Sequence, residues 1–282
     1  MTYYSIKIFS LILSFFPRLL AIKFAIFLGT LIYFIYPKRK NVAIKNLTIA
    51  FPEKSLDDLE KIIKITYQHY MIITVDFLRQ NFFNKNQIII DQETKEILST
   101  KHGLIFMTAH IGNWEMFIPI ISQYKKMIAV VRVQANEGGD KFVRYLRSFH
   151  NITLIPNKGS KRKMLKGLLN GESLLLASDQ NAKKAGTYID FFGLPASIPR
   201  GAAHFHVKTN KKILVGFCML NENDHYEFKL RELNYKKTSE QKDQLIIQIN
   251  TEYSRILEEE IKKHPNQYFW FHKKWDKEIY NI

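Results

Sequence analysis

The sequence predicts an α/β fold: a mixed central sheet with flanking crossover helices, preceded by an apolar N-terminal helical segment. Two observations predict the sheet. Beyond residue 86, short apolar runs of strand length alternate with amphipathic runs of helical length. Helices of that length between strands are typical of parallel crossover connections. A third observation sets the N-terminus apart, because the first 52 residues contain no Asp or Glu.

The N-terminal segment holds two apolar blocks, residues 8–16 and 24–36, separated by Pro17, Arg18 and Lys23. The second block would span about 20 Å as a helix, against a hydrocarbon core of roughly 30 Å. Basic residues follow it directly, which indicates the cytoplasmic side of a membrane. We interpret residues 1–40 as a membrane anchor, either tilted across the bilayer or lying in its interface. An apolar helical hairpin packed on the protein core is the alternative.

Residues 41–282 are predicted to form one globular domain. Its first helix begins at a Ser55 cap and continues to residue 77 with apolar residues at helical spacing. Residues 226–233 alternate and predict an added edge strand, and residues 239–262 predict a long amphipathic helix. The other predicted strands are residues 104–109, 128–132, 153–155, 173–178 and 213–219. The other predicted helices are residues 114–123, 141–149, 161–169 and 202–208.

Composition narrows the class of partner. The chain has 282 residues, a formal net charge of +16 and 46% hydrophobic residues, enough for a large core. The positive charge favours anionic partners such as a membrane surface, an acidic protein or nucleic acid. The acid-free apolar N-terminus favours lipid over nucleic acid. Cys218, the single cysteine, lies in an apolar strand and is expected to be a core residue, so no internal disulfide forms.

The stretch MTAHIGNWEMF, residues 107–117, places His110 where a strand ends and a helix is about to begin. Ligand sites in open α/β sheets form at the carboxyl ends of strands. If the chain turns at Gly112, Glu115 can reach back to one imidazole nitrogen, fix its tautomer and stabilise the imidazolium. The other nitrogen could then take a proton from a hydroxyl. By spacing alone, a structural histidine with Glu115 capping a helix N-terminus is an equal alternative.

Five sequence stretches occur in a recognisable order: FPE after NL, AHIGNWEMF, SDQN, FFGLPASIPRGAA and a terminal QYFWFHKKW. Together they resemble the bacterial lipid A biosynthesis acyltransferases of the lauroyl/myristoyl type, over essentially the whole chain. The resemblance implies a membrane-bound enzyme that moves an acyl chain from an acyl thioester, usually on acyl carrier protein, to a hydroxyl of a lipid A precursor. It implies that His110 and Glu115 are catalytic, and that residues 41–282 are the catalytic domain, facing the cytoplasm on the inner membrane.

Further residues are candidates for substrate binding. Arg132 follows an apolar run at a predicted strand end, where an arginine can bind a phosphate or stabilise an oxyanion. A solvated arginine is the alternative. Asp179 resembles the family's Asp-Gln element, although it could simply cap a helix. Phe192, together with Gly193, could shape a substrate pocket or only pack in the core. The candidates are Arg132, Asp179, Gln180, Phe192, Gly193 and Arg200.

The reaction implied by the resemblance requires no cofactor or metal. His204 and His206 diverge on a helix, which disfavours a metal site, and His272 is expected to be structural or interfacial. Expected partners are an acyl-thioester donor, a glycolipid acceptor and the membrane, without nucleic acid. A different acceptor (another glycolipid, a lysophospholipid or an aminolipid) remains open, as does a non-catalytic, basic membrane-binding protein on the same fold.

Overall fold

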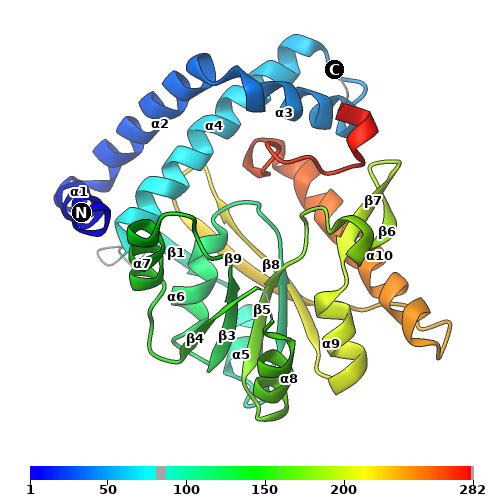
Figure 1. Ribbon diagram of the computed structural model, residues 1–282. Helices are drawn as coiled ribbons and strands as arrows, with labels where there is room; N and C mark the ends of the chain where they lie inside the picture. The colour runs from blue at the N-terminus through cyan, green and yellow to red at the C-terminus, as the bar shows by residue number, and fades with distance from the viewer. Residues whose placement is uncertain (81–86, 158, 281–282) are drawn as a thin grey trace.

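The computed structural model describes residues 1–80, 87–157 and 159–280. Its centre is a 7-stranded sheet in the order β1-β9-β8-β2-β5-β3-β4, covered by helices on both faces (Figure 1). β8, β2, β5, β3 and β4 run parallel, β9 is antiparallel to β8, and β1 is parallel to β9. The strands are β1 Ile88–Ile90, β2 Ile105–Thr108, β3 Met127–Val131, β4 Ile152–Pro156, β5 Ser173–Ala177, β8 Ile213–Leu220 and β9 Tyr226–Glu232.

The predicted mixed sheet with crossover helices is therefore confirmed, and each predicted strand is present within two residues of its expected ends. The predicted edge position of residues 226–233 is wrong, because β9 pairs with β1 on its other side. A separate hairpin, β6 Gly186–Phe191 and β7 Leu194–Pro199, was not predicted. The helices beyond residue 55 are α4 Leu56–Leu78, α5 Gln92–Ser99, α6 Phe117–Ile121, α7 Glu137–Leu146, α8 Lys161–Leu169, α9 Gly201–Thr209 and α10 Lys242–Lys263.

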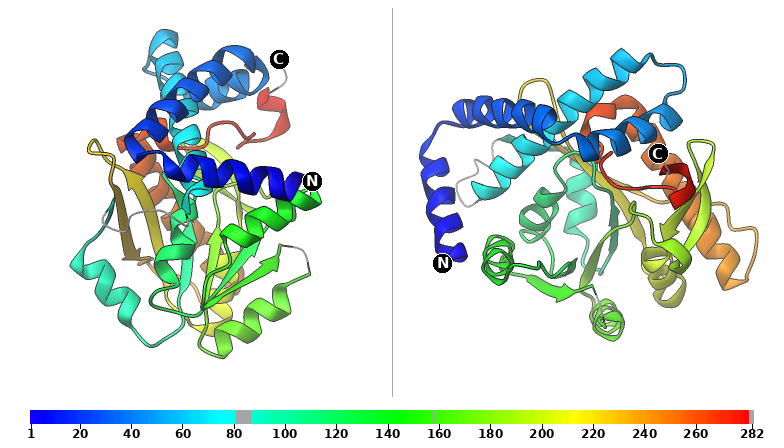
Figure 2. Two further views of the ribbon diagram at one scale, coloured as in Figure 1. Left: turned by 90° about the vertical axis from the view of Figure 1, so that its left-hand side faces the viewer. Right: turned by 45° about the horizontal axis from the view of Figure 1, so that its top comes forward.

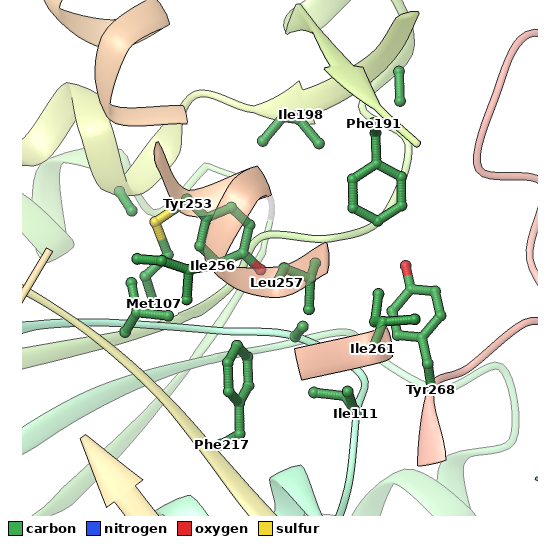
Figure 3. Close-up of a cluster of buried hydrophobic side chains, with 14 of the residues drawn as sticks. Met107, Ile111, Phe191, Ile198, Phe217, Tyr253, Ile256, Leu257, Ile261 and Tyr268 are labelled. Atoms are coloured by element: carbon green, nitrogen blue, oxygen red, sulfur yellow. The ribbon is translucent and has the colours of Figure 1, made fainter. Parts of the chain in front are cut away.

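Alternating side chains of β2 divide the core between the two faces of the sheet. Ile105 and Met107 face the larger cluster, and Phe106 faces the smaller one. In the larger cluster, α10 lies between the sheet and the β6–β7 hairpin, with Tyr253, Ile256 and Leu257 among the buried side chains (Figure 3). The Tyr253 hydroxyl donates to the Thr108 carbonyl at 2.8 Å. This packing fixes the carboxyl end of β2, where His110 follows.

The apolar N-terminal segment forms two helices, α1 Thr2–Phe15 and α2 Arg18–Ile35, followed by α3 Pro37–Ala50 (Figure 2). One face of α2 packs on α4 through Ala21, Ala25 and Gly29, small residues that allow close approach. A Cβ on Gly29 would meet the α4 backbone. Arg18 also joins this helix to Asp76 of α4 through an ion pair of 2.9 Å.

The opposite face of α1 and α2 is exposed and apolar. α2 is long and apolar enough to cross a membrane, judged by length and composition, and only 28% of that span is buried. At 18 residues it measures about 27 Å. The exposed large apolar side chains of the two helices include Ile8, Phe9, Leu11, Ile12, Phe15, Leu19, Leu20, Phe24, Phe27, Leu31, Phe34 and Ile35.

Candidate active site

His110 lies two residues beyond the carboxyl end of β2, in the middle of the sheet. Its backbone carbonyl accepts hydrogen bonds from the Phe269 amide at 2.9 Å and the Tyr70 hydroxyl at 2.8 Å. The chain then turns at Gly112, which has φ +56° and lies so close to Cys218 that a side chain would collide with the Cys218 backbone. Contacts from α4, the C-terminal segment and β8 thus hold the backbone of residues 110–113 in place.

Asp179 is the hydrogen-bond partner of the His110 ring. The distance from His110 Nδ1 to Asp179 Oδ1 is 2.8 Å. The sheet register explains the meeting: Thr108 of β2 pairs with Ala177 of the parallel strand β5, so the residues two positions further on leave the same edge side by side. The Asp179 side chain is fully buried and the His110 side chain is 24% exposed. Asp179 is therefore placed to orient the imidazole and to stabilise its charged form.

The pKa shifts of both partners, His110 and Asp179, support this pairing. Burial by itself lowers the pKa of His110, but the charge and hydrogen bond of Asp179, together with the charge of Glu115, bring the net pKa above the ordinary value. Burial by itself raises the pKa of Asp179, but its interaction with His110 brings that pKa well below the ordinary range. With Nδ1 donating to the carboxylate, Nε2 is the ring nitrogen that can accept a proton from a substrate.

The predicted contact from Glu115 to the imidazole is wrong. Glu115 follows Trp114 in a short 3-10 turn, Trp114–Met116, and its carboxylate accepts instead from Arg147. The two hydrogen bonds from the guanidinium are 2.9 and 2.5 Å long. The Trp114 indole donates to the same carboxylate at 3.0 Å. Since Arg147 and Trp114 occupy the carboxylate, Glu115 acts on His110 only through its nearby charge, which helps to raise the pKa of His110.

Three aromatic side chains surround His110. The ring centroids of Trp114 and Phe269 lie 5.1 and 6.2 Å from the imidazole, and Tyr70 contacts both of these aromatic rings. Tyr70 is partly buried, and the loss of solvent around its hydroxyl holds the pKa of that group well above the ordinary value. The phenol therefore stays neutral and serves as the donor to the His110 carbonyl. The three rings together form an apolar wall beside the imidazole.

The C-terminal segment, residues 267–275, completes the site. His272 Nδ1 bonds the Phe269 carbonyl at 3.0 Å, and the two rings are stacked. Burial lowers the pKa of His272 to about 4, so its ring is neutral, and its expected structural or interfacial role stays a prediction. Lys274 is 1% exposed and donates to the Asp179 carbonyl, with its ammonium 4.3 Å from the Phe191 ring centroid. Burial lowers the pKa of Lys274 to about 8.

The remaining candidates divide into two groups. Arg132 follows β3 and Gln180 follows Asp179, so both lie at the same sheet edge as His110, and both are exposed. Phe192 and Gly193 instead form the two-residue turn between β6 and β7, with φ +54° and +78°. Arg200 forms an ion pair with Asp243 on the surface. Phe192 lies against the Phe51 ring and under the Lys262 ammonium, so the contacts described for this second group are with residues other than His110.

Residues 1–80, 87–157 and 159–280 contain no group of three or more His, Cys, Asp or Glu side chains that could hold a metal ion. Cys218 is buried as expected, and burial raises the pKa of its thiol. Sequence reasoning missed Tyr70 as part of the site, and it gave Arg147 only as a loosely aligned candidate beside Arg144. Only the spacing of Tyr70 on its helix was visible, and helical spacing does not indicate which catalytic loop the helix packs against.

Comparison with known proteins gives a consistent family. Residues 1–277 match the family described as bacterial lipid A biosynthesis acyltransferase. The chain is 22% identical over 248 residues to a lipid A biosynthesis palmitoleoyltransferase of Escherichia coli, covering 84% of this chain and 79% of that protein. It is 25% identical over 122 residues to a phosphatidylinositol mannoside acyltransferase of Mycobacterium tuberculosis, covering 41% and 38%.

Among solved structures, the chain is similar to a 1-acyl-sn-glycerophosphate acyltransferase from Thermotoga maritima. The TM-score is 0.39 at 14% sequence identity, covering 91% of this chain and 98% of that chain.

Proposed function

Because the chain belongs to the bacterial lipid A biosynthesis acyltransferase family and is an acyltransferase, we propose that it transfers a fatty acyl chain from acyl carrier protein to a hydroxyl of a lipid A precursor. The observation that carries the proposal is the His110–Asp179 pair at the carboxyl end of adjacent strands β2 and β5. It provides a general base beside an aromatic wall. The acceptor supplies the nucleophile, so no serine or cysteine of the protein is required.

The reaction proceeds by direct transfer. His110 Nε2 takes the proton of the acceptor hydroxyl while that oxygen attacks the thioester carbonyl. Asp179 stabilises the imidazolium that forms, in the manner of a buried carboxylate behind a catalytic histidine. When the tetrahedral intermediate collapses, the carbon–sulfur bond breaks and the imidazolium returns its proton to the departing thiolate. The products are an ester and a free thiol, and His110 is neutral again.

Glu115 and Arg147 act together beside this pair. The ion pair is largely buried, with side chains 10% and 18% exposed. It holds Trp114 against the imidazole and provides a fixed dipole near the reacting carbonyl. Arg132, exposed at the end of β3, is our candidate for contact with an acceptor phosphate.

We further propose that α1 and α2 lie in the membrane interface on the cytoplasmic side. α2 is bound to α4 along its length, and Asp76 of α4 holds Arg18 at the start of α2. Crossing the bilayer would draw the polar residues of α4 into hydrocarbon, which costs several kcal/mol for each unsatisfied group. An in-plane position instead buries the exposed apolar face and leaves the exposed Lys23 for anionic headgroups, while Lys7 lies over the Tyr145 ring.

The acceptor is open to test, because the base acts on any suitably placed hydroxyl. A relative is named for phosphatidylinositol mannoside, so that acceptor and a lysophospholipid belong in the assay. The first experiment compares detergent-solubilised wild type with His110→Ala, using acyl carrier proteins loaded with chains of several lengths and a tetra-acylated lipid A precursor. Mass spectrometry identifies the product. We expect transfer by wild type and at least about a hundredfold loss in the variant.

Equal activity in the two proteins would exclude His110 as the base. Transfer only to another lipid acceptor would retain the mechanism and replace the substrate. No transfer to any acceptor, with a control enzyme active in the same mixture, would favour the non-catalytic alternative.

A further inference from the structure

A basic cleft opens beside the catalytic edge of the sheet. It has a volume of about 880 Å³ and lies between the segment that follows Asp179 and the C-terminal segment. In Figure 1 these segments, together with the β6–β7 hairpin, lie on the side of the molecule away from α1. Gln180 lines the cleft and is the next residue after Asp179, so the cleft begins one residue from the carboxylate that holds His110.

Four lysines line this cleft: Lys183, Lys184, Lys273 and Lys277. Within the described ranges, none of them has a carboxylate within ion-pair distance. Asp276 provides the one carboxylate among the lining residues that the structure describes, and the Tyr188 hydroxyl donates to it at 3.3 Å. Four cations around one acidic group make a strongly electropositive cleft, which favours an anionic ligand.

Specific hydrogen bonds fix the conformation of the loop that carries Lys183. Lys183 has φ +53°, a left-handed conformation that is unfavourable for a residue with a side chain. The Asn181 side chain accepts from the Lys183 amide at 2.7 Å, and the Ser197 hydroxyl donates to the Lys183 carbonyl at 2.6 Å. Asn181 also donates to the Trp275 carbonyl at 3.0 Å, which joins the two walls of the cleft.

The floor of the cleft has unused hydrogen-bonding capacity. Trp275 and His272 both line it, and in the described part of the chain the Trp275 indole nitrogen and His272 Nε2 have no hydrogen-bond partner. Trp275 is 1% exposed. Buried polar nitrogens are usually paired, so these two nitrogens of lining residues leave hydrogen-bonding capacity for a polar ligand beside the four lysines.

We infer that this cleft binds a phosphate ester of a substrate while the acyl group is transferred at His110. Phosphate is the anionic group that lysines contact as point charges. The inference rests on the proposed function, since it assigns the cleft to one of the two substrates of that reaction. The phosphate belongs either to the pantetheine arm of the donor or to the glycolipid acceptor, and the experiment below separates these sources.

The test variant is Lys183→Gln/Lys184→Gln/Lys277→Gln. These side chains are exposed, and none has been assigned to the His110 machinery. The matched control, Lys101→Gln/Lys126→Gln/Lys166→Gln, removes the same charge from exposed lysines. Lys101 and Lys126 precede β2 and β3, at the opposite edge of the sheet.

Steady-state kinetics form the first arm. We expect the test variant to raise KM about tenfold or more for one substrate while kcat changes less than about twofold, because two or more charge-assisted contacts are lost in binding alone. The control should stay near wild type. The rise should vanish when that substrate lacks phosphate: an acyl-N-acetylcysteamine thioester in place of acyl carrier protein, or a dephosphorylated acceptor. Unchanged KM for both substrates, or equal rises in test and control variants, would overturn the inference.

The second arm needs no catalysis. The chain has three tryptophans, so ¹⁵N-tryptophan labelling gives three indole signals, and Trp275→Phe identifies the one in the cleft. We expect 4′-phosphopantetheine or glucosamine 1-phosphate to shift the Trp275 signal in wild type and control but not in the test variant. No shift with either compound would overturn the inference. A shift in a protein that transfers no acyl group would sustain the site and refute the proposed reaction, so the two failures are distinguishable.

Discussion

Replacing Asp179 with asparagine distinguishes the effect of the Asp179 carboxylate on His110 from that of the Glu115 carboxylate. Asparagine keeps the size of the side chain but removes its charge from a fully buried position 2.8 Å from Nδ1. A hydrogen bond to a charged group contributes roughly 1.5–3 kcal/mol. The attraction between an imidazolium and a carboxylate about 4 Å apart is roughly 4 kcal/mol at an effective dielectric of 20. A transition-state loss of about 3 kcal/mol lowers kcat/KM on the order of 100-fold.

The pH dependence provides a second readout of the same variant. His110 must be neutral to accept a proton, so wild-type activity should rise with pH through the raised pKa of His110. In Asp179→Asn, burial is no longer opposed by this carboxylate, so the pKa of His110 should fall and the midpoint should move to lower pH. The assay is kcat/KM against pH, together with NMR titration of the His110 ring.

Glu115→Gln is the comparison that can refute this reasoning. It leaves the His110–Asp179 hydrogen bond intact, so its effect on the pKa of His110 should be downward but smaller. If Glu115→Gln lowered the pKa of His110 more than Asp179→Asn did, Glu115 would be the orienting carboxylate and the geometry described above would be wrong for the working enzyme.

Three further substitutions test the buried ion pair, the α2–α4 packing and the contact of Lys274 with Asp179. Arg147→Met leaves the buried Glu115 carboxylate without its ion partner and should cost roughly 3–5 kcal/mol of unfolding free energy in denaturant; a loss below 1 kcal/mol would contradict a buried pair. Gly29→Leu forces a side chain against the α4 backbone and should cost about 1–3 kcal/mol by the same measurement, while Phe27→Leu on the exposed face should change little. Lys274→Met removes the donor to the Asp179 carbonyl and should lower kcat while leaving KM for both substrates near wild type; an unchanged kcat would exclude a positioning role, and Lys274→Arg should restore part of it.

Much of the fold was predictable from local pattern. The strand that became β2 is a run of apolar residues that are all buried, and the Ser55 cap accepts from the Asp58 amide at 3.2 Å, as the sequence indicates. Elements with weak sequence patterns were not predicted. β1 has three residues, and the β6–β7 hairpin turns at Phe192, whose positive φ has no signature in an aromatic residue. The turn could not be recognised because Phe-Gly lacks the usual Asn-Gly chemistry.

The sequence by itself determined that the chain has an acid-free apolar start, an α/β domain, and a histidine at the end of a central strand. These follow from hydrophobic periodicity, which is local. Only the tertiary structure decided which carboxylate serves His110. Glu115 is five residues away and Asp179 is 69, but strand pairing between β2 and β5 brings the distant one into contact. Arg147 then occupies the nearer carboxylate. Register across a parallel sheet is a long-range property, and spacing along one strand does not contain it.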